Sequence, residues 1–278
     1  MFDLGKILAR WYERLVESSC SEQPFAIPAS VRRQFVNPTA FQCVATIRKY
    51  ASGARRVLIV GDGGGRDYYS LKLLGRQPIV MDIATQSIIP EIVIADANAP
   101  FPFAPRTFDA VIMAEVIEHL PNDFQALSEV RGILKDDGAL VLTVPYFHEA
   151  EPTHIRIHSP ASVERLLRAS GWKITDYVER GGGLCRLMEW LPLRVLVHSF
   201  NGLFWLTKRK TAYQPLYRGV FAIDAWLGRK CQWVHRWSRS YGAFIRCCKA
   251  DPVDWVAFNK RAFENMHVTS SGYLSRSH

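Results

Sequence analysis

Three glycines follow a short apolar run and could bring the backbone against a ligand. They are Gly61, Gly63 and Gly65 in the stretch VLIVGDGGGRD (57–67), which leads into the helical pattern YYSLKLLG. Because glycine has no Cβ, such a turn can be tight and can approach a ligand closely beneath a helix N-terminus. A dinucleotide-binding turn of the G-x-G-x-x-G type would need glycine where Arg66 stands. The turn therefore indicates a nucleotide-like ligand, with a plain strand-to-helix connection as the alternative.

Acidic residues stand directly after three further apolar runs. Asp82 ends PIVMD (78–82), and Asp96 and Glu115 follow the runs IVIA (92–95) and FDAVIMA (108–114). An acid at the end of the second strand of a nucleotide-binding sheet accepts hydrogen bonds from ribose hydroxyls, in NAD enzymes as in others. The stretch ADANAPFPFAPRTFDAVIMAEVIEHL (95–120), in which Asp96 follows the third run and Phe108 begins the fourth, separates this chain from the NAD enzymes.

Histidines gather in the stretch PYFHEAEPTHIRIHSP (145–160), which contains His148, His154 and His158. The stretch follows a predicted strand, at the edge of the sheet where ligands bind. A histidine, with a pKa of about 6.5, is the usual general base when a hydroxyl must lose its proton. We favour His154 and then His119 as catalytic residues. Solvated loop histidines are the alternative.

The motif EVIEHL (115–120) allows a second kind of chemistry. Glu115, Glu118 and His119 could share one helix face or turn, because residues three and four apart are neighbours on a helix. Such a group could hold a divalent metal. The default interpretation is a helix cap with a buried histidine, so no metal is predicted.

The elements that would position these residues form a Rossmann-like α/β fold. Continuous apolar strands that alternate with helices are typical of a parallel sheet buried on both faces. We expect a seven-stranded, mostly parallel sheet with an antiparallel last strand. Ser159 and Pro160 predict the start of a helix, and residues 24–38, with three prolines, predict a loop. The expected strands are residues 57–60, 78–81, 92–95, 108–114, 138–144, 172–178 and 240–250.

These motifs, in this order, resemble a class I S-adenosylmethionine-dependent methyltransferase of the type 11, ubiquinone-pathway-like group. The resemblance extends from Val57 to Val178 and includes the strand at 241–249. It implies that S-adenosylmethionine is the cofactor. The family usually has Asp or Glu two residues before the first glycine, where this chain has Ile59. Asp62 is the residue that could compensate.

The same resemblance implies a role for each cofactor-binding residue. The glycines of the turn would cradle the methionine part, and Asp82 would bind the ribose hydroxyls. Asp96 and the backbone of Ala97 would hold the adenine, with Glu115 beside the cofactor. The predicted cofactor-binding residues are thus Gly61, Asp62, Gly63, Gly65, Asp82, Asp96, Ala97 and Glu115.

The composition predicts one large domain with additions. The chain has 278 residues, 48% of them hydrophobic and 22% charged, which is ordinary for a globular protein. It shows no uninterrupted apolar stretch that would span a membrane or serve as a signal peptide, so we expect a cytoplasmic protein. We predict an N-terminal helical lid (1–50), a methyltransferase domain (51–250) with a helical insertion (184–238), and a C-terminal tail (251–278).

The insertion region concentrates the positive charge of the chain. Residues 186–250 contain 12 Lys or Arg and 2 Asp or Glu, together with five of the eight tryptophans, whereas the net charge of the whole chain is +9. Charge confined in this way indicates an anionic partner. A membrane surface is the preferred partner, since tryptophan and basic side chains suit lipid headgroups. An RNA-binding face and a helical cover for the core are the alternatives.

The sequence thus predicts an enzyme that methylates an oxygen of a small-molecule, sugar or lipid-linked acceptor at the inner face of a membrane, as a peripheral protein. The alternatives are an RNA 2′-O-methyltransferase and a non-catalytic membrane-surface protein that retains the fold. Nucleic acid is not the expected partner, because the sequence contains no recognisable nucleic-acid-binding module.

Overall fold

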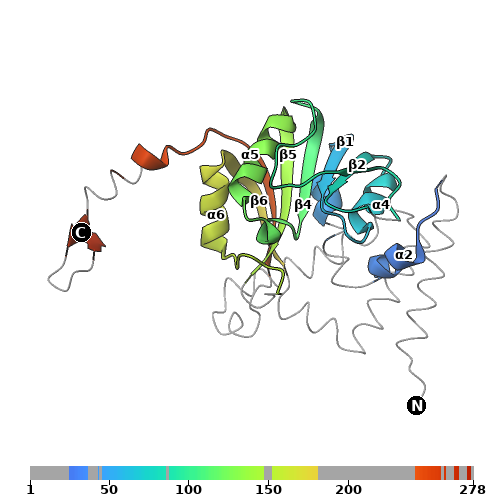
Figure 1. Ribbon diagram of the computed structural model, residues 1–278, viewed down its shortest axis with the longest axis horizontal. Helices are drawn as coiled ribbons and strands as arrows, with labels where there is room; N and C mark the ends of the chain where they lie inside the picture. Colours follow the sequence, from blue (N-terminus) through green and yellow to red (C-terminus); the bar gives the residue numbers. More distant parts are fainter. Residues whose placement is uncertain are drawn as a thin grey trace, which may run out of the picture.

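A computed structural model describes residues 25–36, 43, 46–85, 88–146, 152–180, 242–257, 260, 266–268 and 274–276. Its centre is a seven-stranded sheet with the strand order β3-β2-β1-β4-β5-β7-β6 (Figure 1). A separate two-stranded sheet pairs β8 (Met266–Val268) with β9 (Leu274–Arg276). The strands of the large sheet are β1 (Arg56–Val60), β2 (Gln77–Asp82), β3 (Ile92–Ile94), β4 (Phe108–Ala114), β5 (Leu134–Pro145), β6 (Trp172–Arg180) and β7 (Gly242–Lys249).

The strand directions confirm the predicted α/β fold. Strands β1 to β5 pair in parallel, whereas β7 is antiparallel to both of its neighbours, β5 and β6. At Gly242, where β7 begins, an added Cβ would lie 2.1 Å from the Val144 carbonyl oxygen. Only glycine fits this close approach, so the entry of the last strand into the sheet depends on that residue.

Helices cover both faces of the sheet, which explains why its strands are apolar throughout. Val57 and Ile59 of β1 belong to one hydrophobic core, whereas Leu58 and Val60 belong to another. The first core includes side chains of α2 and α4, and the second includes side chains of α5 and α6 (Figure 1). The helices are α2 (Ala29–Val36), α4 (Arg66–Lys72), the 3-10 helix η1 (Ile117–His119), α5 (Asp123–Ile133) and α6 (Pro160–Ala169).

A local sequence signal accounts for the start of α6 but not for that of α2. Ser159 caps α6 as predicted, because its hydroxyl accepts the backbone N–H of Ser162 while the Ser162 hydroxyl accepts that of Ser159. The loop predicted over residues 24–38 is wrong, since α2 lies there. The helix begins after Pro28, whose carbonyl accepts the N–H of Val31, and Val31 is fully buried. Tertiary packing therefore overrides the prolines.

Several expectations fall on residues outside the described part of the chain. These are the first helical piece of the lid, within residues 1–24, and the basic, tryptophan-rich insertion at 184–238. Among the described residues, no helix is both long enough and apolar enough to cross a membrane. The division of the chain into lid, domain with insertion, and tail stays a prediction.

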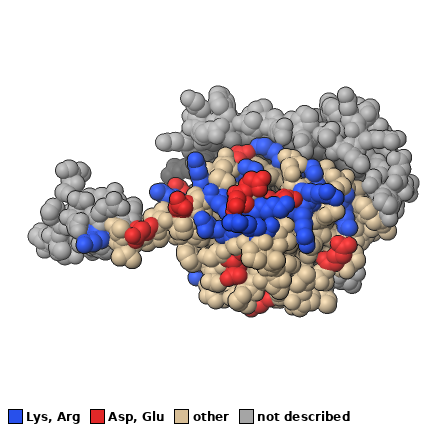
Figure 2. Space-filling model, turned by 90° about the horizontal axis from the view of Figure 1, so that it is seen from above, with Lys and Arg blue, Asp and Glu red and all other residues tan. Residues whose placement is uncertain are grey.

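Charged side chains gather at the edge of the sheet where the parallel strands begin. Lys135 lies 2.5 Å from Asp109, and both Arg106 and Lys249 lie 3.5 Å from Asp136. Lys and Arg side chains form a band on the face that Figure 2 shows, with Asp and Glu side chains within it. Mixed pairs such as these are ordinary solvated surface and contribute little to stability.

Candidate functional site

A cavity of about 400 Å³ lies at the opposite edge, where β1 to β4 end. Its wall includes residues that follow each of these four strands, and it continues to His119 and Leu120 at the end of η1. Six of the eight predicted cofactor-binding residues line it, namely Gly61, Gly63, Asp82, Asp96, Ala97 and Glu115. The topology explains this meeting, since the carboxyl ends of neighbouring parallel strands share one edge of a sheet.

Gly61 makes a tight turn in the cavity wall. Its φ is +68°, a left-handed conformation that side chains other than glycine rarely adopt. An added Cβ would lie 2.9 Å from Cγ2 of Val116, which lines the same cavity. The Gly61 N–H donates to the Met81 carbonyl oxygen over 2.8 Å, which ties the turn to β2. Any larger residue would strain the turn and press on the opposite wall.

Asp62 and Gly65 shape the turn and do not line the cavity. The Asp62 carboxylate is 5% exposed and accepts the backbone N–H of Tyr68 over 2.7 Å. Burial, followed by the nearby charge of Asp67, raises the pKa of Asp62 to about 7. Gly65 precedes α4 with φ +67°. The Asp62 carboxylate thus holds the start of α4, while Ile59, where the family has an acid, is fully buried in the core.

Asp96 lies in a small polar network that includes Asn98, a residue that the sequence analysis missed. Oδ1 of Asp96 accepts both the backbone N–H of Asn98, at 2.8 Å, and its side-chain amide, at 2.9 Å. Oδ1 of Asn98 in turn accepts the N–H of Asn122, just before α5, over 3.1 Å. Asn98 therefore ties the Asp96 end of the cavity to the segment after η1. The only sequence signal was an aspartate two residues before a polar residue, which is typical of a turn.

Glu115 occupies an unusual backbone position at the end of β4. Its φ is +57°, in the left-handed region. Two contacts hold it there: the Glu115 N–H donates to the Thr143 carbonyl over 3.0 Å, and the Thr143 hydroxyl donates to Oε1 of Glu115 over 2.7 Å. Strained non-glycine residues of this kind cluster at functional sites. The carboxylate thus lies fixed in the cavity wall beside β5.

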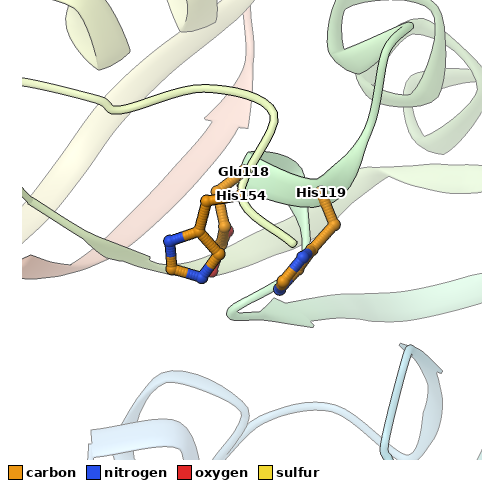
Figure 3. Close-up of side chains that lie close together, drawn as sticks. All are labelled: Glu118, His119 and His154. Carbon is orange, nitrogen blue, oxygen red and sulfur yellow. The ribbon is translucent and has the colours of Figure 1, made fainter. Parts of the chain in front are cut away.

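The two predicted catalytic histidines lie next to each other. Their ring centroids are 4.8 Å apart and the rings meet edge to face, although His119 follows β4 and His154 follows β5. His119 also lines the cavity, whereas His154 does not. In Figure 3 both rings extend to the same side, next to Glu118. The sequence-based default of a buried histidine is wrong here, because Glu118 is fully buried and His119 is partly exposed.

Backbone hydrogen bonds hold the His154 loop against η1. The Glu118 carbonyl accepts the N–H of Ile155 at 2.9 Å and that of Arg156 at 3.2 Å. The guanidinium of Arg156 pairs with Asp123 and donates to the Pro121 carbonyl. His158 lies apart, buried beside Tyr146, and burial lowers its pKa. His148 lies outside the described residues.

One comparison with known proteins finds a match over part of the chain. Residues 58–142 match the family model described as a methyltransferase domain. The chain therefore carries a class I S-adenosylmethionine-dependent methyltransferase domain, as the sequence predicted, and S-adenosylmethionine is the cofactor that this domain implies. The cavity fits S-adenosylmethionine. Its carboxylates can accept hydrogen bonds from the hydroxyl and amino groups of the cofactor, and the glycine turn, which has no side chains, lets the cofactor lie close to the backbone.

Solved structures of low identity are also similar to the chain. A putative methyltransferase from Bacillus halodurans is 16% identical, with 76% of this chain and 100% of that chain covered and a TM-score of 0.48. A methyltransferase from Archaeoglobus fulgidus is 19% identical, with 75% and 94% covered and a TM-score of 0.49. The [4+2]-cyclase SpnF is 18% identical, with 90% and 97% covered and a TM-score of 0.49. No match was found among curated proteins.

Proposed function

We propose that this enzyme binds S-adenosylmethionine in the cavity and transfers its methyl group to an oxygen of an acceptor that enters beside His119 and His154. The observation that carries the proposal is the meeting of six predicted residues, from the ends of four strands, in one cavity that also reaches His119. The acceptor side is then the edge of the cavity formed by η1 and the loop after β5.

The proposed contacts follow the order of the strands. Gly61 and Gly63 would receive the methionine part, because their backbone can approach closely. Asp82, at the end of β2, would accept hydrogen bonds from the ribose hydroxyls, and Asp96 would accept one from the adenine amino group. The bonds in the described structure engage only Oδ1 of each of these two aspartates. Their Oδ2 atoms therefore have no partner among these bonds.

The tautomer of His119 supports its role in removing the acceptor proton. Nδ1 of His119 lies 3.0 Å from the Thr153 carbonyl oxygen, which can only accept a hydrogen bond. Nδ1 therefore carries a proton, and in the neutral imidazole the lone pair is then on Nε2. When bound, S-adenosylmethionine supplies a methyl group activated by a positively charged sulfur. The residues of the site would hold the acceptor oxygen in line with that methyl group while Nε2 takes the hydroxyl proton, and positioning would supply much of the rate gain.

The surface beside His154 supports an acceptor with apolar parts. Ile155 and Ile157 are each 57% exposed and flank Arg156 on the loop that carries His154. A sugar or polyprenyl-type lipid intermediate would offer a hydroxyl for methylation together with apolar surface for these side chains. We therefore propose a lipid-linked or sugar acceptor, used at a membrane surface.

Transfer of a labelled methyl group tests the function directly. The full chain would be incubated with S-adenosylmethionine labelled in its methyl group and, in separate reactions, with a lipid extract, soluble glycans and RNA. We expect label in the lipid or glycan fraction, and a much lower rate for His119→Gln at unchanged cofactor affinity. Label in RNA alone would contradict the proposed acceptor but leave methyl transfer intact. No cofactor binding in calorimetry would contradict the function itself.

The membrane part of the proposal depends on the basic insertion and has its own test. Replacing Lys208, Arg209 and Lys210 with glutamine should remove up to about 3 kcal/mol of attraction to anionic vesicles, at about 1 kcal/mol per basic residue. Co-sedimentation with vesicles of increasing anionic lipid content measures this attraction, and added salt should weaken it. Cofactor affinity serves as the control and should not change. Absence of vesicle binding by the unaltered chain at low salt would contradict membrane association.

A further inference from the structure

Within the described part of the chain, Glu118, His119 and His154 form a group whose ligand atoms all lie within 4.8 Å of one another. We propose that these three residues bind a divalent transition-metal ion beside the cofactor cavity. Figure 3 shows the three side chains together, Glu118 and His119 coming from η1 and His154 from the loop after β5. A carboxylate and two imidazoles from two separate segments make a donor set that neither segment supplies alone.

The hydrogen bond of His119 prepares it for such a role. Histidines that bind metals almost always donate their other ring N–H to a carbonyl or carboxylate, which fixes the ring and leaves the ligating nitrogen deprotonated. The Nδ1–H of His119 donates to the Thr153 carbonyl, and Thr153 directly precedes His154. The same contact therefore orients one imidazole and places the residue that carries the other.

The backbone around the group is already organised. The Glu118 carbonyl accepts the N–H groups of Ile155 and Arg156, the two residues just after His154, and these bonds hold the His154 loop against Glu118. Arg156 anchors the same loop to Asp123 and Pro121. Glu118 is fully buried, and a carboxylate away from water attracts a cation more strongly than an exposed one.

The donor chemistry selects the class of metal. Two imidazoles with one carboxylate suit Zn²⁺, Mn²⁺, Fe²⁺ or Co²⁺, whereas Ca²⁺ and Mg²⁺ prefer oxygen ligands. Ligands about 2.1 Å from a tetrahedral ion lie about 3.4 Å apart, so ligand atoms that now lie as far apart as the 4.8 Å limit must move closer when the ion binds. Three protein ligands leave at least one position open.

Glu115, which the motif spacing had suggested as a partner of Glu118 and His119, does not belong to the group. Its Oε1 accepts the Thr143 hydroxyl, and its left-handed backbone separates it from η1. His154, which is 39 residues farther along the chain than Glu115, takes the place of Glu115. The structure therefore assigns a different set of donors from the one that the sequence had suggested.

The open position would face the acceptor, because His119 lines the cofactor cavity. This step rests on the proposed function. An acceptor hydroxyl bound to the ion would lose its proton to solvent water, since a metal lowers the pKa of a bound hydroxyl. Its oxygen would then bond to the methyl carbon while the carbon–sulfur bond breaks, its electron pair staying on sulfur. With the ion bound, the lone pair of His119 would hold the metal, so solvent water would take the acceptor proton in place of the Nε2 atom to which the metal-free mechanism above gives that role.

Direct metal binding tests the proposal without any turnover. The full chain, without a histidine tag and stripped with a chelator, would be titrated with Co²⁺ by absorption spectroscopy and with Zn²⁺ by calorimetry. We expect one ion per chain and a Co²⁺ spectrum that indicates nitrogen and oxygen ligands. His119→Gln and His154→Gln should each weaken binding at least about 10-fold, the lower limit of what loss of even a supporting group costs at metal sites. Glu118→Gln should do the same where circular dichroism confirms that this buried variant folds.

Glu115→Gln is the matched control and should keep metal affinity unchanged, because Glu115 is outside the group. Absence of a Co²⁺ complex, or unchanged affinity in both histidine variants, would overturn the metal site. Methyl transfer that persists at full rate in excess chelator would also overturn it, and would leave the proposed function standing with His119 as a base. Metal binding without any binding of S-adenosylmethionine would contradict the proposed function and keep the metal site.

Discussion

Substitution of Gly61 by alanine gives the most direct test of the cavity wall. Two costs arise together: the backbone must hold φ +68° with a side chain, and the new Cβ meets Cγ2 of Val116 at 2.9 Å. The left-handed conformation costs about 1–2 kcal/mol for a residue with a Cβ. Overpacking of this kind adds about 1–3 kcal/mol. We therefore expect Gly61→Ala to lower the free energy of unfolding by more than the cost of the left-handed conformation alone, because the contact with Val116 adds to it.

Gly75 provides a matched control for this prediction. Its φ is +70°, and nothing lies within 4 Å of a Cβ added there, so Gly75→Ala carries the conformational cost without the contact. Urea unfolding should show Gly61→Ala as the more destabilised variant by about 1 kcal/mol or more, and Val116→Ala should recover part of that difference in a double-mutant cycle. Calorimetry should show weaker binding of S-adenosylmethionine for Gly61→Ala alone. Equal losses of unfolding free energy for the two glycine variants, with no coupling to Val116, would refute the inference that a Cβ at Gly61 presses on Val116.

Three further predictions concern polar side chains of the cavity wall and of the glycine-rich turn. Asp82→Ala should weaken S-adenosylmethionine binding by about 2–4 kcal/mol in calorimetry, because one or two hydrogen bonds to a charged group are lost. Asn98→Ala should weaken it by about 0.5–1.5 kcal/mol through misplacement of Asp96, and Asn98→Asp should not restore it, since a second carboxylate would repel Asp96. Burial raises the pKa of Asp62 to about 7 from an ordinary 3.8. Between these two values the folded protein holds a proton on Asp62 that the unfolded chain has lost. The free energy of unfolding should therefore fall as pH rises through this interval. Asp62→Asn should remove that slope in unfolding measured from pH 4 to pH 8, and an unchanged slope would contradict the assignment.

Much of the fold could be predicted because burial on both faces leaves a strong mark on the sequence. Ile112, in the middle of β4, pairs with Ile59 on one side and Val141 on the other, and all three are fully buried. Continuous apolar runs of this kind fit a central parallel strand. Asp82 and Asp96 could then be placed without coordinates, because a residue that follows a parallel strand must lie at the carboxyl edge of the sheet.

Features that depend on loop paths could not be predicted in this way. The bond between Asn98 and Asn122 joins two segments whose separation in space is set by how η1 turns, and residue type carries no signal for it. α2 was missed because its proline-rich approach predicts a loop, whereas the helix is stabilised by burial of Val31 against the glycine-rich turn. Asp62 has the right charge for a ligand contact but points into the start of α4.

The motif EVIEHL shows where spacing rules fail in physical terms. Placing Glu115 with Glu118 and His119 assumes one continuous helix, in which residues three and four apart are neighbours. The chain instead leaves β4 through a left-handed residue at Glu115 and forms only the short 3-10 helix Ile117–His119. Glu115 is thereby turned toward Thr143 and the cavity, while Glu118 and His119 meet a loop that arrives from β5. This single break in the helix separates the motif into a cofactor contact, Glu115, and a candidate metal site at Glu118 and His119. Substitution of Glu115 should therefore affect cofactor binding, whereas substitution of Glu118 or His119 should affect metal binding.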